Sequence, residues 1–239
     1  MRTRRQILEL IRFLPLVCFT APSAAAEASK TAGFVGKLEK GTPQRIVLYG
    51  TSLTAEGPWV GQLRKTVDGK YPGLATWINN GGSGKASDWG LKNLKAKVID
   101  QKPDVVFIEF SMNDAAPKLK VSREQARENL FKMVARIRGA QPHCEIILQL
   151  MNPADVDVGG KFSPRPDLRL YQNDYRDFAA ANGLLCIDHF PAFQSQLDKG
   201  SDAYRLYVPD GVHPNAQGCE SFLIPTLLKN LGIVRQDAD

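Results

Sequence analysis

The sequence is poor in metal-binding residues and in long apolar runs. Its 239 residues include four cysteines and three histidines, and the three cysteines beyond residue 26 lack the spacing of a metal site. No stretch after residue 26 reaches the ~20 consecutive apolar residues that span a bilayer. We therefore expect no metal centre and no stable membrane insertion of the mature chain.

Excess charge of one sign is also scarce. The formal net charge is +6, but the first 26 residues supply four arginines and one glutamate, which leaves +3 for the remainder. The other lysines and arginines are mixed with acids along the chain, as on a solvated protein surface. So small an excess excludes nucleic acid as an expected partner.

The first 26 residues resemble a secretory signal peptide. Three arginines within the first five residues precede an apolar segment at 13–19 and small residues at 23–26, and we expect cleavage after Ala26. Glu9 and Arg12 interrupt the pattern and leave an N-terminal amphipathic helix as the alternative. Because export is the favoured interpretation, we expect a periplasmic or secreted protein.

Cysteine usage is compatible with export but does not define a disulfide. Cys18 follows Leu and Val instead of a small residue, so lipid attachment is not expected there. Cys144, Cys186 and Cys219 remain after cleavage, and Cys144 and Cys186 lie in or beside expected strands. The sequence leaves open one disulfide with one free thiol, or three free thiols.

The chain is long enough for one domain with its own core. Residues 27–43 are small and polar and contain Gly and Pro, which is typical of a linker, so we expect the domain at 44–239. Within it, short apolar runs that suit buried parallel strands alternate with helical patterns. The runs are Arg45–Tyr49, Ala75–Ile78, Val105–Phe110, Glu145–Leu150 and Leu184–Ile187. This alternation predicts a single α/β domain with a five-stranded parallel sheet between helices.

Helical patterns fill the segments between the runs. The clearest has an apolar stripe from Ala126 to Ile137 and opens with Ser122 and Gln125, a capping-box pair. Pro225 falls inside the last helical pattern, where it should either kink the helix or be absorbed near its middle.

Active sites of parallel α/β sheets gather at the carboxyl ends of the strands, and polar residues follow several of the runs. Ser52 comes directly after the first run, where its hydroxyl could be exposed on a sharp turn or could cap a helix. Gly84 lies in the Gly-rich segment 79–85 after the second run. That segment fails the phosphate-loop pattern because Ala follows Lys85, so it is either a flexible turn or a backbone that approaches a substrate closely.

Two further segments carry candidate residues. Asn113, in Met-Asn-Asp after the third run, could donate its amide to a substrate oxygen or form a simple turn. Near the C-terminus, Asp210 and His213 stand three positions apart. Histidine can take the proton of a serine nucleophile, and a carboxylate can set its tautomer and stabilise its cation. The pair fits a serine hydrolase, with an exposed turn as the alternative.

In chain order, the motifs are Gly-Thr-Ser-Leu, Asn-x-Gly-x-x-Gly, Met-Asn-Asp and Asp-x-x-His. Over residues 45–231 this order resembles the SGNH hydrolase superfamily, also called GDSL esterases and lipases. The resemblance implies a flavodoxin-like α/β/α sandwich and a triad of Ser52, Asp210 and His213. Thr51 replaces the family's aspartate before the serine. That departure questions the hydrogen bonding of the loop more than catalysis.

The resemblance also implies an oxyanion hole and an activity. Gly84 matches the glycine whose N–H binds the oxyanion, and Asn113 matches the asparagine whose amide does so. The implied enzyme is a serine ester hydrolase that forms an acyl-enzyme and needs no cofactor or metal. His143 and His189 have no matching partners and are expected in the core or on the surface.

The substrate is expected to be a small-molecule or polysaccharide ester. Short loops without a lid favour short acyl chains, with O-acetyl groups of a carbohydrate as the main hypothesis. Trp59 and Trp89 could line a sugar platform or belong to the core. The alternatives are a lipase, lysophospholipase or thioesterase on the same fold, a carbohydrate O-acetyltransferase, and a non-catalytic carbohydrate-binding module. No oligomeric state is predicted.

Overall fold

The structure is a computed structural model that describes residues 32–154 and 164–233. The expected signal peptide, residues 1–26, and Cys18 within it lie outside the described residues. None of the helices within these ranges combines the length and the hydrophobicity that a membrane span requires.

Five parallel strands form the centre of the fold, as the apolar runs predict. They are β1 (Gln44–Gly50), β2 (Ala75–Asn79), β3 (Val105–Glu109), β4 (Glu145–Leu150) and β5 (Leu185–Asp188). Their order in the sheet is β2-β1-β3-β4-β5, which is the flavodoxin-like order and confirms the predicted fold. Because all pairings are parallel, the segments that follow the strands meet at one edge of the sheet.

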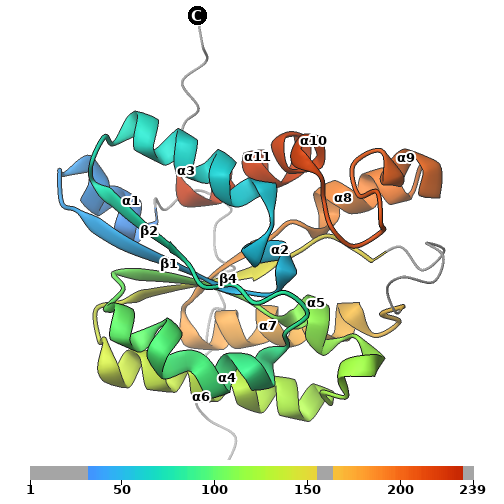
Figure 1. Cartoon of the computed structure of the whole chain (residues 1–239), viewed down its shortest axis with the longest axis horizontal. Helices are drawn as coiled ribbons and strands as arrows, with labels where there is room; N and C mark the ends of the chain where they lie inside the picture. Colours follow the sequence, from blue (N-terminus) through green and yellow to red (C-terminus); the bar gives the residue numbers. More distant parts are fainter. Residues whose placement is uncertain (1–31, 155–163, 234–239) are drawn as a thin grey trace, which may run out of the picture.

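Helices connect the strands and cover both faces of the sheet. The α-helices are α1 (Gly33–Glu39), α2 (Ser52–Ala55), α3 (Pro58–Lys70), α4 (Ser87–Lys97), α5 (Ser111–Asp114), α6 (Arg123–Ala140), α7 (Leu168–Asn182), α8 (Phe190–Leu197), α9 (Ser201–Arg205), α10 (Ala216–Gly218) and α11 (Ile224–Leu231). Shorter turns are η1 (Ile99–Gln101), η2 (Pro117–Leu119) and the π-helical η3 (Cys219–Leu223). Figure 1 shows α3, α8 and α11 on one side of the sheet and α4, α6 and α7 on the other.

The three inner strands, β1, β3 and β4, are buried almost completely from both sides, which explains their continuous apolar composition. The edge strands β2 and β5 are partly exposed. Successive side chains of a strand point to opposite faces. In β1, Ile46 and Leu48 join the core formed with α1, α3, α8 and α11, whereas Val47 and Tyr49 join the core formed with α4, α6 and α7. All four side chains are fully buried, so β1 is the central element of both cores.

Helix α1 corrects the linker that the sequence predicts at 27–43. Its residues Phe34, Val35 and Leu38 are buried in the core. The carboxylate of Glu145, at the start of β4, accepts hydrogen bonds from the N–H groups of Gly33 (3.0 Å) and Phe34 (2.6 Å). This capping group lies 112 positions away in the sequence, so no local signal marks the beginning of the helix.

Two expectations at helix ends are refined. Ser122 caps α6 by accepting the Gln125 N–H (3.2 Å), but the Gln125 side chain donates to Asn129 (2.8 Å). Pro225 stands in the first turn of α11, immediately after the π-helical turn Cys219–Leu223. The wider turn precedes the residue that lacks an N–H, so the proline is absorbed at a helix junction.

The three described cysteines are free thiols. In the register between β4 and β5, Cys186 stands opposite Leu148, four positions beyond Cys144. The two cysteines that the sequence places in or beside neighbouring strands are therefore offset along the sheet. Of the two alternatives left open, the structure contains the one without a disulfide.

Candidate active site

Ser52 lies at the carboxyl edge of the sheet, where β1 ends. It is the first residue of α2, and Thr51 precedes it as the N-cap residue, with its hydroxyl accepting the Leu53 N–H (3.2 Å). A strand that turns this sharply into a helix leaves the Ser52 side chain half-buried at the surface of the edge. The alternative in which Ser52 caps the helix is therefore wrong, because the cap is Thr51, and the Ser52 side chain is partly exposed on the sharp turn.

Ser52, His213 and Asp210 are brought together in a line of hydrogen bonds. Ser52 Oγ lies 2.8 Å from His213 Nε2, although 161 positions separate them in the sequence. On the other side of the ring, His213 Nδ1 lies 2.7 Å from Asp210 Oδ2. The arrangement gives a hydroxyl next to a base, with the base oriented by a carboxylate, which is the geometry of nucleophilic catalysis.

The environment of Asp210 favours its charged form. Partial burial opposes ionisation, but hydrogen bonds from the N–H groups of His213 (2.7 Å) and Val212 (2.9 Å) and from the imidazole lower its pKa. A carboxylate held ionised beside Nδ1 keeps a proton on that nitrogen and leaves Nε2 free to accept one from Ser52. The tautomer is inferred from this network.

The loop that carries Asp210 and His213 owes its shape to Gly211 and Asn152. Gly211 has φ +74°, a left-handed conformation that folds the chain back so that the next two N–H groups reach Asp210. Asn152, fully buried after β4, donates to the carbonyl of Val212 (3.0 Å). Sequence reasoning missed Asn152, whose two-residue distance from a strand end is its one local signal.

The Gly-rich segment after β2 lies at the same carboxyl edge of the sheet and is hydrogen-bonded to the end of β1. Gly82 N–H donates to the carbonyl of Gly50 (2.8 Å), and a side chain at Gly81 would collide with the backbone of Ala55. Gly84 has φ +69° and is exposed. Among the described residues, no hydrogen-bond acceptor pairs with the N–H of Gly84 or of Ser52. Both donors are therefore available to an oxygen bound between the loops.

Asn113 lies in the short helix α5, directly after β3, and its side chain is buried. Its amide nitrogen donates to the carbonyl of Lys85 (2.8 Å), which joins it to the Gly-rich segment. Its amide oxygen faces the guanidinium of buried Arg165 (3.5 Å), and Arg165 also donates to the carbonyl of Met112 (2.7 Å). These contacts orient the amide nitrogen toward the Gly-rich segment at Lys85. Arg165 is a second residue that sequence reasoning missed.

A cavity of about 360 Å³ opens beside Ser52 and His213. Glu56, Trp59 and Cys219 contribute to its lining. Trp59 is a core residue, since it is 1% exposed and its indole N–H donates to the Leu53 carbonyl (2.6 Å). Burial raises the pKa of the Cys219 thiol to about 11, so this cysteine is unsuited to act as a nucleophile near neutral pH.

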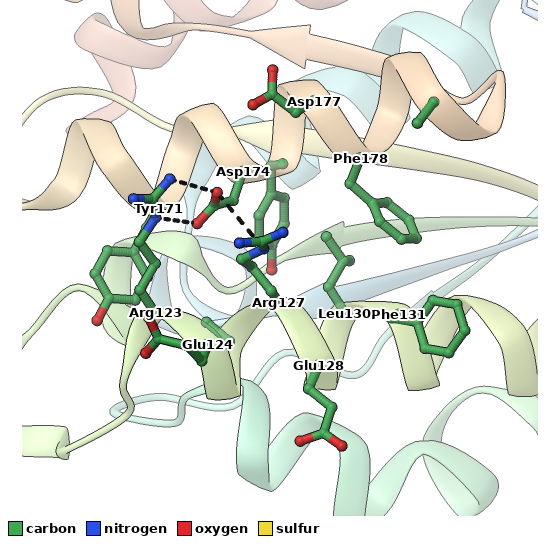
Figure 2. A pocket seen from close by; sticks show the side chains of 13 residues that line it. Arg123, Glu124, Arg127, Glu128, Leu130, Phe131, Tyr171, Asp174, Asp177 and Phe178 are labelled. Carbon is green, nitrogen blue, oxygen red and sulfur yellow. Dashed lines mark hydrogen bonds and ion pairs between the residues drawn. The ribbon is translucent and has the colours of Figure 1, made fainter.

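A larger cavity, about 730 Å³, lies between α6 and α7. Figure 2 shows Arg123 and Arg127 directed at Asp174, with the Phe131 and Phe178 rings farther along the groove. Its lining contains no serine, cysteine or histidine, so a serine–histidine pair like that of Ser52 and His213 is absent from this groove.

Two other residues considered in the sequence, His189 and Trp89, contribute to packing. His189 is fully buried, its Nε2 lies 3.1 Å from the Gln149 amide, and burial lowers its pKa to about 3. Trp89 is half-buried and packs against Tyr49 and Phe110, so it belongs to the core. Within the described ranges, no group of three or more His, Cys, Asp or Glu residues is placed to hold a metal ion.

The sequence matches a known family over most of its length. The profile of the GDSL-like Lipase/Acylhydrolase family matches residues 46–220. The protein named uncharacterized lipoprotein YqeF, from Bacillus subtilis strain 168, is 28% identical over 165 residues. That alignment covers 55% of this chain and 63% of YqeF, so the chain spans less than two thirds of this curated relative.

Solved structures share the fold at low sequence identity. The acetylxylan esterase Axe2 from Geobacillus stearothermophilus superposes with a TM-score of 0.65 and 22% identity, over 81% of this chain and 96% of Axe2. LAE5, an alpha/beta hydrolase enzyme from the metagenome of Lake Arreo, Spain, has a TM-score of 0.67 and 22% identity, over 80% of this chain and 96% of its own. These likenesses concern the fold.

Proposed function

The chain belongs to the GDSL-like lipase/acylhydrolase family, and we propose that it is a carboxylic ester hydrolase whose catalytic triad is Ser52, His213 and Asp210. The observation that carries this proposal is the line of hydrogen bonds from Ser52 Oγ through the imidazole to Asp210 Oδ2. Variants of Axe2 described as catalytic mutants change a serine, an aspartate and a histidine, the last two being three positions apart. The same spacing separates Asp210 and His213, which supports the assignment.

The reaction is a two-step acyl transfer. His213 Nε2 takes the proton of the Ser52 hydroxyl while Oγ forms a bond to the ester carbonyl carbon. The carbon–oxygen bond to the alcohol then breaks as the imidazolium returns that proton to the leaving oxygen. Water then gives a proton to His213 Nε2 while its oxygen bonds to the acyl carbon. The bond from that carbon to Ser52 Oγ breaks as the imidazolium returns the proton to Oγ, which releases the carboxylic acid and restores the enzyme. Asp210 stabilises the imidazolium in both steps and stays ionised because its pKa is lowered.

Three donors stabilise the negative oxygen of the tetrahedral intermediates. They are the N–H groups of Ser52 and Gly84 and the side-chain amide of Asn113. The Asn113 contact with the Lys85 carbonyl supports this role, because it holds the amide against the segment that carries Gly84. Removing one such donor typically raises the barrier by about 3 kcal/mol.

The proposed substrate is a short-chain ester, with O-acetyl groups of a carbohydrate as the natural target. A cavity of about 360 Å³ is at the small end of ligand pockets, which supports a short acyl chain over a fatty acyl chain. The exposed carboxylate of Glu56 lines this cavity. Its negative charge repels anionic substrates, so neutral, hydroxyl-rich substrates should bind better. Axe2 is an acetylxylan esterase, which supports acetylated xylan as the first polymer to test.

The test is a chain-length series of p-nitrophenyl esters, from acetate to palmitate, beside acetylated xylan and pectin. Wild type should have its highest kcat/KM on the acetate ester and should release acetate from at least one polymer. Ser52→Ala should lose about 10⁴-fold or more of kcat. Ser195→Ala, which removes an exposed serine hydroxyl from α8, is the matched control and should retain full activity.

Two outcomes would overturn parts of the proposal. A Ser52→Ala protein that folds normally and still turns over p-nitrophenyl acetate through a covalent acyl-enzyme would refute the nucleophile. Faster cleavage of palmitate than of acetate esters would refute the short-chain substrate and favour a lipase.

Export is part of the proposed function, because a polysaccharide ester is met outside the cytoplasm. Residues 1–26 are the proposed signal, with the mature chain starting at Glu27. The relative YqeF is named a lipoprotein, and this name supports the proposal that the present chain is also exported. N-terminal sequencing of the protein recovered from the periplasm or medium of the producing cells should begin at Glu27, whereas an intact Met1 on cytoplasmic protein would contradict export.

A further inference from the structure

A carboxyl group lies buried beneath the turn that carries Ser52. Glu109 is the last residue of β3, stands opposite Gly50 in the register with β1, and is 1% exposed. It interrupts the otherwise apolar strand Val105–Glu109, where a charged residue costs stability unless it is hydrogen-bonded. Glu109 lies at the edge of the sheet where Ser52 begins the proposed reaction. This location indicates a role at the site.

The Glu109 carboxyl receives hydrogen bonds from both sides of Ser52. The N–H of Thr51 donates to one oxygen (2.9 Å), and the Thr51 hydroxyl lies 2.8 Å from the other. The Thr54 hydroxyl donates to the first oxygen as well (3.1 Å). Burial raises the pKa of Glu109 to about 7, and the hydrogen bonds from Thr51 and Thr54 act against that rise.

The backbone at this point is shaped to admit the carboxyl group. A Cβ atom built on Gly50 would stand closer than 3.0 Å to a Glu109 oxygen and to the Thr54 hydroxyl. The absence of a side chain at Gly50 therefore lets the carboxyl contact the turn directly. Thr51 Oγ1 also accepts the Leu53 N–H, so one hydroxyl connects Glu109 to the first turn of α2.

We propose that Glu109 is a positioning residue for Ser52, acting through Thr51 and Thr54 to hold the serine hydroxyl in line with His213. The inference rests on the proposed function of Ser52 and deepens it. Glu109 is 1% exposed, and its contacts hold Thr51 and Thr54, which stand on either side of the nucleophile in the sequence. The family's aspartate before the serine is Thr51 here, and the acid that fastens the turn comes from β3.

The first test is Glu109→Gln, which keeps the side-chain shape but replaces one acceptor oxygen with an N–H donor. We expect kcat to fall about tenfold to a hundredfold because the nucleophile loses its alignment, with KM changed by less than about twofold. Glu145→Gln is the matched control, because Glu145 also accepts two backbone N–H groups but at the beginning of β4. It should lower the unfolding temperature and leave kcat unchanged.

The second test moves the carboxyl group from position 109 to position 51. Thr51→Asp alone places two carboxylates in contact and should lower kcat by at least about a hundredfold. Adding Glu109→Gln lets the new aspartate accept from the glutamine amide, and kcat should recover at least about tenfold over the single variant. A folded double variant no more active than Thr51→Asp would overturn the proposal, as would a Thr51→Asp protein with wild-type kcat.

A third variant covers the case in which Glu109→Gln does not fold. Thr54→Val removes one donor to Glu109 and keeps the side-chain shape, so kcat should fall about twofold to tenfold with KM unchanged. Unchanged kcat in folded Thr54→Val and Thr51→Val proteins would overturn the proposal, because the turn would then be held without these contacts.

Failure of this inference is distinguishable from failure of the triad. Covalent labelling of Ser52 by a fluorophosphonate, and its loss in Ser52→Ala, reports on the nucleophile alone. If Ser52 is labelled and required while Glu109→Gln keeps full kcat, the positioning role fails and the triad stands. If Ser52→Ala remains active, the triad fails whatever Glu109→Gln does.

Discussion

Asp114→Asn is predicted to change how the stability of this protein depends on pH. Asp114 ends α5, is 1% exposed, and one of its oxygens accepts the N–H of Ser87 (2.8 Å). Its other oxygen has no partner among the described residues. Burial raises the pKa of Asp114 to about 7, against the lowering effect of the Ser87 hydrogen bonds and with a smaller increase from Asp88.

The magnitude follows from the difference between the folded and unfolded pKa. An unfolded aspartate titrates near 3.9, so the shift is roughly three units and amounts to about 4 kcal/mol at 1.36 kcal/mol per unit. The folded protein holds the proton more tightly than the unfolded chain. The contribution is therefore complete at low pH and is lost as the pH rises from about 4 to about 7. Between pH 5 and pH 8 the loss is roughly 2.5 kcal/mol.

The assay is urea unfolding of wild type and Asp114→Asn at pH 5, 6, 7 and 8. Asparagine cannot ionise, so the free energy of unfolding of the variant relative to wild type should rise by roughly 2.5 kcal/mol across this range. Taking the difference removes most of the titration of Glu109, which is present in both proteins, because the Asp114 charge is the smallest contributor to the raised pKa of Glu109. Asp100→Asn, which removes an exposed carboxylate paired with Lys95, is the control and should differ from wild type by a nearly constant amount.

A constant difference between wild type and Asp114→Asn from pH 5 to pH 8 would refute the reasoning. It would mean that Asp114 has the same affinity for protons in the folded and unfolded chains, which is incompatible with a buried carboxyl that has an unpartnered oxygen. A difference that falls with pH would show the opposite sign, with the charged form stabilised by folding.

Three other predictions concern the site, the core and the thiols. Asn113→Ala should lower kcat by about 10² to 10³ with little change in KM, because an oxyanion donor acts mainly in the transition state; steady-state kinetics on p-nitrophenyl acetate measures it. Phe193→Ala should lower the free energy of unfolding by about 3–5 kcal/mol, since this ring is fully buried, and urea unfolding measures the loss. Cys144 and Cys186 should be alkylated by iodoacetamide at pH 7.5 far more slowly than a free cysteine, because burial raises the pKa of each thiol to about 12; rapid labelling of the native protein would contradict this.

Much of the fold follows from local patterns. The apolar runs at 45–49 and 145–150 coincide with strands to within one residue at each end, because strands buried on both faces cannot alternate with polar residues. The run at 75–78 also coincides with its strand, although this edge strand is only partly buried. The expected linker at 27–43 was wrong where α1 lies, since two glycines weaken the helical pattern and the capping Glu145 is distant in the sequence.

The residues that carry the proposed chemistry were also recognisable, whereas those that hold them in place were not. Ser52 and Asn113 come shortly after expected strands, and Asp210 precedes the last expected helix, where polar residues are conspicuous. Glu109 and Asn152 gave no comparable signal, because a single polar residue at the end of an apolar run is as typical of a strand end as of a site. Their importance becomes visible through contacts across 58 and 60 positions of the sequence.

Local sequence specified the five strands, most of the longer helices, and the segments that hold a hydroxyl, an imidazole and a carboxylate, because these properties depend on neighbours within a few residues. Tertiary structure decided that β1 pairs with both β2 and β3, and hence that Gly50 meets Glu109 and that Ser52 reaches His213. Strand order and register are set by how the two cores pack as a whole, since shifting a strand by one residue would turn every one of its side chains to the opposite face. No window of local sequence contains that information, and so the support beneath the nucleophile could be found only in the folded chain.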